Sequence, residues 1–155
     1  MIQRIQTVYL LIVAGLFFAL LFLPLAVIQS GKTLYTFKLA GLHSTALPVT
    51  LVYPTWSLIV IATIIVFLTL FIIFKYKKRI FQMRLCIYNA LLMIGFCILV
   101  GFYLWQFNHS QELPGIKINF RLWSCFPIIA LILNYLAIRG IGVDEAMVRS
   151  SERLR

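Results

Sequence analysis

The sequence predicts an all-α membrane protein, a bundle of four transmembrane helices formed by a single domain over residues 1–155. Hydrophobic residues make up 63% of the chain and charged residues only 12%, far below the roughly one quarter that is usual in globular proteins. About 20 apolar residues are needed to cross the hydrocarbon of a bilayer. Lys, Arg, Asp and Glu are absent from four stretches that are long enough, or nearly so: residues 5–31, 39–74, 85–111 and 122–138.

We expect the four helices at about 5–28, 56–74, 85–105 and 122–138. The first is interpreted as a retained helix and not a cleaved signal peptide, because its apolar run exceeds about 20 residues and no A-x-A site closes it. The fourth would span only about 25 Å, so its flanking arginines must snorkel or the bilayer must thin. Pro24 and Pro127 fall in the outer thirds of helices one and four, where neighbouring helices would satisfy the freed carbonyls.

The distribution of Lys and Arg predicts the orientation. Ten of the fourteen basic residues fall on the side that holds both termini and the loop between helices two and three. Both termini are therefore predicted to be cytoplasmic. Trp56, Trp105 and Trp123 fall at the opposite boundary, where aromatic rings prefer to sit. We interpret the net charge of +10 as positive-inside topology and attraction to anionic headgroups, and we expect no binding of nucleic acid.

The two outer loops are predicted to form a small β-sheet. In the first, "TLYTFKLAGL" at 33–42 alternates and "LPVTLVY" at 47–53 is β-branched, so a hairpin with "GLHSTA" between its strands is expected. In the second, "GIKINFR" at 115–121 also alternates. Because an isolated hairpin is marginally stable in water, we expect a three-stranded sheet that caps the helices.

No Asp, Glu, Lys, Arg or His lies in the middle of any predicted helix. A proton relay, an ion pathway or a carboxylate-based catalyst within the bilayer would lack its usual groups. His43, His109 and Glu112 lie in the outer loops, but their spacing matches no zinc pattern. We therefore predict no enzyme, with no catalytic, cofactor-binding or metal-binding residue.

Four neutral polar residues are predicted to lie at the same depth in the membrane. Each is five or six positions along its predicted helix from the basic residue at the cytoplasmic end. This places them roughly 7–9 Å inside the cytoplasmic boundary, at about 1.5 Å per residue. The layer consists of Tyr9, Thr69, Asn89 and Asn134. Two interpretations remain open: hydrogen bonds that join the helices, or a small polar pocket for a headgroup or quinone.

The tail, residues 139–155, is predicted to form a short amphipathic helix that starts after Gly140 and Gly142. Its acidic residues come first and its basic residues last, an order that suits the helix dipole. Because so short a helix is marginal alone, it needs a surface: the membrane, the "KYKKR" loop or another protein. The predicted cytoplasmic docking surface consists of Lys75, Lys77, Lys78, Arg79, Arg84, Asp144, Glu145, Arg149, Arg153 and Arg155.

Three stretches carry a family resemblance: "MIQRIQTVYL", "RIFQMRLCIYNALL" and "DEAMVRSSERLR". The matching residues are Arg4, Arg84, Leu85, Cys86, Asn89, Asp144, Glu145, Val148, Arg149, Ser150, Arg153, Leu154 and Arg155. The chain closely resembles, over essentially its full length, a family of small four-helix inner-membrane proteins of Bacteroidetes known only as a domain of unknown function. Ser151 and Glu152 replace the Ala-Asp pair expected there. The resemblance implies a bacterial inner-membrane location and supplies no activity.

The leading functional hypothesis is a non-enzymatic accessory or scaffold subunit of a membrane complex. Its partner would be another protein or a second copy of the chain, bound at the cytoplasmic docking surface. The alternative is a binder or carrier of a lipid or other small hydrophobic molecule within the helix bundle.

Overall fold

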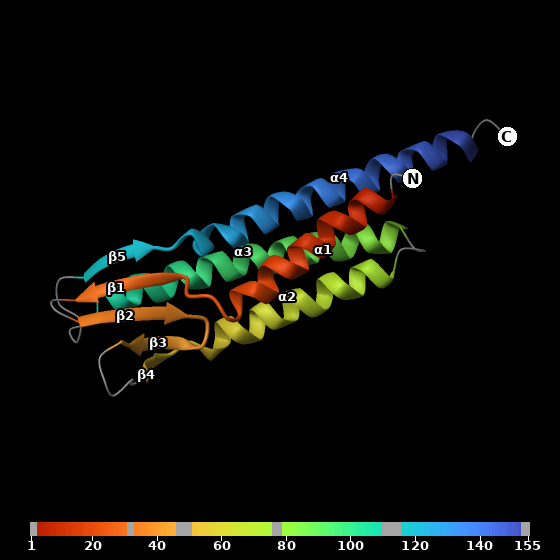
Figure 1. Cartoon of the computed structure of the whole chain (residues 1–155). Helices are drawn as coiled ribbons and strands as arrows, with labels where there is room; N and C mark the ends of the chain where they lie inside the picture. Colours follow the sequence, from red (N-terminus) through yellow and green to blue (C-terminus); the bar gives the residue numbers. More distant parts are fainter. Residues whose placement is uncertain (1–2, 31–32, 46–50, 76–78, 110–115, 153–155) are drawn as a thin grey trace.

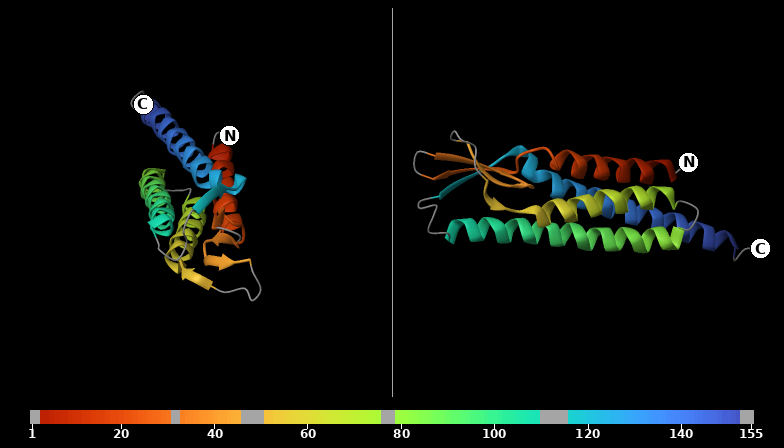
Figure 2. Two further views of the ribbon diagram at one scale, coloured as in Figure 1. Left: turned by 90° about the vertical axis from the view of Figure 1, so that its left-hand side faces the viewer. Right: turned by 90° about the horizontal axis from the view of Figure 1, so that it is seen from below.

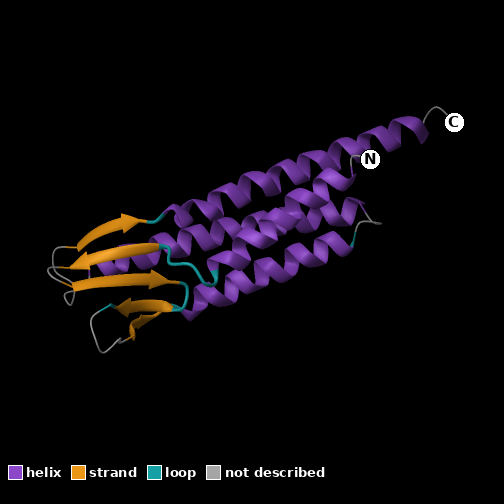
Figure 3. Cartoon of the chain, in the orientation of Figure 1, coloured by secondary structure: helices purple, strands orange, loops and turns teal. Residues whose placement is uncertain are grey.

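A computed structural model describes residues 3–30, 33–45, 51–75, 79–109 and 116–152. These residues are mostly helical, with a small antiparallel sheet at one end of the helices (Figures 1 and 3). The helices are α1 (Gln3–Leu20), α2 (Trp56–Phe74), α3 (Arg79–His109) and α4 (Phe126–Glu152), with a 3-10 turn, η1 (Leu122–Cys125), before α4. The strands are β1 (Ala26–Ser30), β2 (Thr33–Lys38), β3 (Gly41–Ser44), β4 (Leu51–Pro54) and β5 (Ile116–Phe120).

The helices run alternately toward the sheet and away from it (Figure 1). Helices α1 and α3 each pack against both α2 and α4. The beginning of α1, the end of α2, the beginning of α3 and the end of α4 consequently lie at the end of the helices remote from the sheet, which we call the far end (Figure 2). The opposite end, where the strands lie, is called the sheet end.

Helix α1 is shorter than the sequence predicts, because it ends at Leu20 and not at residue 28. The amides of Leu21 and Phe22 bond back to Phe18 and Ala19, three residues earlier, and such bonds tighten and close the last turn of a helix. Pro24 follows and has no N–H to continue the ladder. The next residues form β1, which pairs with β2 on one side and β5 on the other.

Helices α3 and α4 are longer than predicted. Helix α3 has 31 residues, about 46 Å at about 1.5 Å per residue, and its outer end packs beside the sheet. Helix α4 continues through Gly140 and Gly142 to Glu152, so the prediction of a separate helix in the tail is wrong. Pro127 lies in the first turn of α4, where the missing N–H removes no helical bond.

The sheet has five strands in the order β4-β3-β2-β1-β5, whereas three were predicted. The small sheet itself is confirmed; β2 and β5 fall within the predicted segments, and β4 extends one residue beyond its segment, to Pro54. The hairpin turn was placed wrongly, because only Leu39 and Ala40 separate β2 from β3. The segment "GLHS" is itself a strand that pairs with both β2 and β4.

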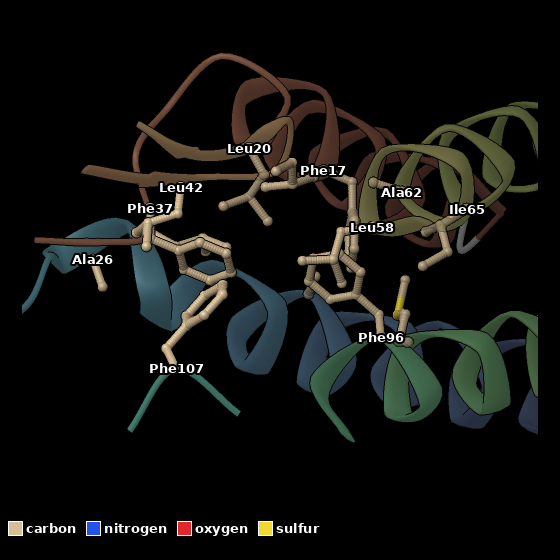
Figure 4. Close-up of a cluster of buried hydrophobic side chains, with 14 of the residues drawn as sticks. Phe17, Leu20, Ala26, Phe37, Leu42, Leu58, Ala62, Ile65, Phe96 and Phe107 are labelled. Atoms are coloured by element: carbon tan, nitrogen blue, oxygen red, sulfur yellow. The ribbon is translucent and has the colours of Figure 1, made fainter. Parts of the chain in front are cut away.

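One hydrophobic core joins the helices to the sheet (Figure 4). Phe17 of α1 meets Phe96 of α3 edge to face, with ring centroids 5.4 Å apart. Nearer the strands, Phe107 of α3 meets Phe37 of β2 at 5.5 Å and Tyr53 of β4 at 5.6 Å. A smaller cluster at the far end contains Leu10, Ile72, Cys86, Ala137 and Ile141.

Apolar side chains also cover the outside of the helices. Phe67, Leu91 and Ile132 on three different helices are 68%, 59% and 53% exposed. Among the residues that the structure describes, three segments are long and apolar enough to cross a membrane: Trp56–Phe74, Ile80–His109 and Leu122–Asp144. The apolar part of α1, Ile5–Leu20, is shorter.

Candidate functional site

The predicted docking surface lies at the far end, and the structure describes part of it. Lys75 follows α2 and is exposed, with its ammonium nitrogen 5.4 Å from the ring centroid of Phe71. Arg84 is exposed on α3. For Glu145 and the remaining basic members, the structure describes either no part of the residue or the backbone alone. These basic members are Lys77, Lys78, Arg79, Arg149, Arg153 and Arg155.

Asp144, which is also assigned to the predicted docking surface, makes a contact within the protein. Its side chain is buried, and its Oδ2 accepts a hydrogen bond of 3.2 Å from Nε2 of Gln6. Gly140 lies one turn earlier on α4, and a Cβ there would come within 3.1 Å of Cγ of Gln6. The glycine therefore leaves room for Gln6 to lie across α4 and reach the carboxylate.

Two members of the predicted polar layer meet directly. Nδ2 of Asn89 on α3 donates to Oγ1 of Thr69 on α2 at 3.1 Å. The Thr69 hydroxyl donates in turn to the carbonyl of Ile65, one turn back in its own helix, at 2.6 Å. Both polar side chains are fully buried, so this chain of bonds joins α2 to α3 inside the protein.

The other two members of the layer are placed differently. Nδ2 of Asn134 on α4 donates to the backbone carbonyl of Cys86 on α3 at 3.0 Å. Tyr9 is half-buried and packs against the far-end apolar cluster. Of the four residues, Asn89 and Thr69 therefore bond to each other, whereas Asn134 and Tyr9 contact other residues.

Two buried glutamines belong to the same region and escaped the sequence analysis. Besides Gln6, Gln82 is buried on α3 and donates from Nε2 to the carbonyl of Ile72 at 3.3 Å. Each glutamine lies two residues from an arginine, Arg4 or Arg84. An uncharged amide just inside a basic helix end is the signal that would have identified them.

In the part of the chain that the structure describes, His43 and His109 do not form a cluster with other metal-ligating groups. His43 is half-buried on β3, and His109 ends α3 with Nδ1 3.3 Å from the carbonyl of Trp105. Glu112 lies outside the described residues. Within the described ranges, no three His, Cys, Asp or Glu side chains gather as a metal site would require.

A pocket of about 460 Å³ lies at the sheet end. Its walls come from α3, from the start of α4 and from the strands β1, β2 and β5, and nearly all of the lining is apolar. Arg121 and Ser124 are among its lining residues. No segment of the sequence signals this pocket, because its walls come from four separate parts of the chain.

The described residues define a mostly helical protein with three helices long and apolar enough to cross a membrane and a small antiparallel sheet at one end. Residues 2–154 match the model of a family described as "Domain of unknown function (DUF4293)", and the chain belongs to this family. The resemblance to a family of unknown function is thereby confirmed. No curated protein matches the chain.

Proposed function

We propose that all four helices cross the inner membrane of a bacterium, with the far end in the cytoplasm and the sheet on the outside. Ten of the fourteen basic residues fall, in the sequence, before residue 5, between residues 75 and 84 or after residue 138, and cytoplasmic segments are enriched in Lys and Arg. The apolar part of α1, Ile5–Leu20, spans about 24 Å at about 1.5 Å per residue. This short span is accommodated by local thinning of the bilayer.

Within the membrane, the protein acts as a non-enzymatic accessory or scaffold subunit that docks a membrane partner at its far end. One observation carries this proposal: α4 continues beyond the ends of the other three helices (Figures 1 and 2). Asp144 and Gln6 fix the base of this extension against α1. Past that point α4 has exposed Ala146 and Met147, and a helix that leaves its own bundle requires another surface to remain stable.

Site-specific photo-crosslinking in native membranes tests this function. A photoreactive residue at Ala146 on the extension should give one discrete adduct, and a control at Leu122 of the sheet end, which is also exposed, should not give it. Mass spectrometry of the adduct separates a second copy of the chain from a different protein. Changing Lys75 and Arg84 to Gln should weaken the Ala146 adduct, because both side chains are exposed on the same basic end.

The outcome that contradicts the proposal is also specific. If Ala146 yields no adduct in membranes where the protein is folded, the extension has no partner. An identical adduct pattern from Ala146 and Leu122 would show unspecific contact along the whole molecule.

A further inference from the structure

The pocket at the sheet end has the size and chemistry of a ligand site. Its volume of about 460 Å³ lies within the roughly 300–1,000 Å³ that is common for small-ligand pockets. We propose that it binds one acyl chain of an anionic phospholipid and that Arg121, at its rim, holds the phosphate of the headgroup. The inference goes beyond the proposed docking function, because it concerns the opposite end of the molecule.

The pocket opens along α3, η1 and the start of α4, and at the end of β5. The exposed members of its lining are Gly101 on α3, Phe120 and Arg121 at the end of β5, Cys125 in η1 and Ile128 on α4. The surface beside this opening is apolar, since Ile98 and Phe102 of α3 are 67% and 52% exposed. With the helices in a membrane, the opening faces lipid, so an acyl chain reaches the pocket without passing through water.

The interior of the pocket suits hydrocarbon better than water. Its innermost side chains include Phe37 and Phe96, both fully buried. The polar groups nearby are already bonded: the Ser124 hydroxyl and the Arg121 amide both donate to the carbonyl of Leu25, the latter at 3.1 Å. Because a buried water needs two to four polar partners, these walls favour methylene groups.

Arg121 places a positive charge at the rim of the pocket. Its side chain is exposed at the end of β5, and in the described part of the chain its guanidinium makes no hydrogen bond or ion pair. Trp123 lies two residues on and is half-buried, at the depth where aromatic side chains meet the headgroup region. A guanidinium matches a phosphate through two parallel hydrogen bonds, so an anionic phospholipid fits both parts of the site.

The chain offers matched variants for a test. Gly101 lines the pocket, and a Cβ built there meets no atom within 4 Å, so Gly101→Leu adds an apolar side chain at the opening. Gly15→Leu on α1 is its control, because Gly15 is also exposed and a Cβ there also meets no atom within 4 Å. Arg121→Gln removes the charge at the rim, and Lys117→Gln, on β5 and outside the pocket, is its control.

Each full-length variant is placed in phosphatidylcholine nanodiscs that contain a phosphatidylglycerol with a photoreactive group in its acyl chain, and adducts are mapped by mass spectrometry. In the unchanged protein, adducts should concentrate between residues 97 and 104 and between 124 and 128, which line the pocket. Gly101→Leu should abolish this concentration. Arg121→Gln should reduce the preference for phosphatidylglycerol over phosphatidylcholine by about tenfold, the value of one charge-assisted hydrogen bond. Both control variants should behave as the unchanged protein does.

Three results would overturn the inference. The first is labelling spread evenly over all lipid-facing residues, and the second is an undiminished pocket signal in Gly101→Leu. The third is displacement of the phosphatidylglycerol by inorganic phosphate, which would mean that the rim binds a free anion and the pocket no acyl chain.

Discussion

Gln6 and Asp144 stand 138 residues apart in the chain and share a buried hydrogen bond of 3.2 Å. The bond joins the beginning of α1 to α4, where α4 leaves the other helices. The chain has only four acidic residues. The bond gives a reason for an acidic residue at position 144, since a carboxylate is a stronger hydrogen-bond acceptor than a neutral group. The contact orders the far end, on which the proposed docking depends.

The first prediction concerns this pair. Gln6→Ala and Asp144→Ala should each lower the free energy of unfolding by about 1–3 kcal/mol, because each leaves a buried polar group without its partner. The double variant should cost less than the sum of the two, with a coupling energy of about 0.5–3 kcal/mol. Reversible unfolding in detergent micelles measures the free energy of unfolding of the two single variants and of the double variant. Strict additivity would show that the two side chains do not interact in solution.

Gly140 provides the second prediction. A methyl group there would meet Cγ of Gln6 at 3.1 Å, so Gly140→Ala should displace Gln6 from Asp144 and destabilise the protein by about 1 kcal/mol or more. Gly15→Ala is the control, as its methyl group meets no atom within 4 Å. Alanine is the better helix former, so Gly15→Ala should be neutral or stabilising. Thermal unfolding measures the change in stability of both variants. An equal change in the two would contradict the close contact between Gly140 and Gln6.

The third prediction concerns the polar layer. Asn89→Leu and Asn134→Leu each remove one hydrogen bond between helices, and such bonds contribute about 0.6 kcal/mol on average and at most about 1.7 kcal/mol in membranes. Each variant should therefore lose stability within that range. Tyr135→Leu, beside Asn134 but 60% exposed, should lose less. Loss of a bound ligand at unchanged stability would favour the polar-pocket interpretation instead.

The fourth prediction concerns the attachment of the sheet to α3. Phe107 is 1% exposed and contacts Phe37 and Tyr53, so Phe107→Ala should destabilise this region by about 3–5 kcal/mol. Hydrogen exchange should show loss of protection in β2 and at the Leu25 amide, which donates to the Phe37 carbonyl of β2 at 2.8 Å. Phe102→Ala, at 52% exposure on the same helix, should leave exchange in β2 unchanged. Equal protection in both variants would mean that the sheet is held by other contacts.

Helix α2 shows where sequence reasoning succeeds. Its predicted limits, residues 56 and 74, are the observed ones, because Pro54 precedes the apolar run and a basic segment follows it. Such boundaries depend on residues next to each other in the chain. Hydrophobicity and charge alone are sufficient to recognise them.

Helix α1 and its continuation show where that reasoning fails. The apolar run continues without a break from α1 into β1, and only strand partners reveal the difference. One of those partners is distant, since Ile28 pairs with Ile118 of β5. A short apolar run does not distinguish a buried strand from a helix. The pairing with other strands therefore determines that this segment is a strand.

In the candidate sites, too, some features are predictable from the sequence and others depend on the fold. The shared depth of Asn89 and Asn134 is visible in their distance from basic residues, whereas their partners are set by helix packing. Asp144 suits the start of a helix, and its burial against Gln6 depends on a glycine one turn away. The sheet-end pocket has walls from α3, β1, β2, β5 and α4, which only the fold brings together.

The claim that the helices cross a membrane with the far end inside is tested most directly by cysteine labelling in intact cells. Cys86, Cys97 and Cys125 are first replaced by Ala, and one cysteine is then introduced at exposed Lys117 of β5 or at exposed Lys75 after α2. A membrane-impermeant maleimide should label Lys117→Cys at once and Lys75→Cys only after the inner membrane is opened. Labelling of Lys75→Cys in intact cells, with Lys117→Cys protected, would contradict the account.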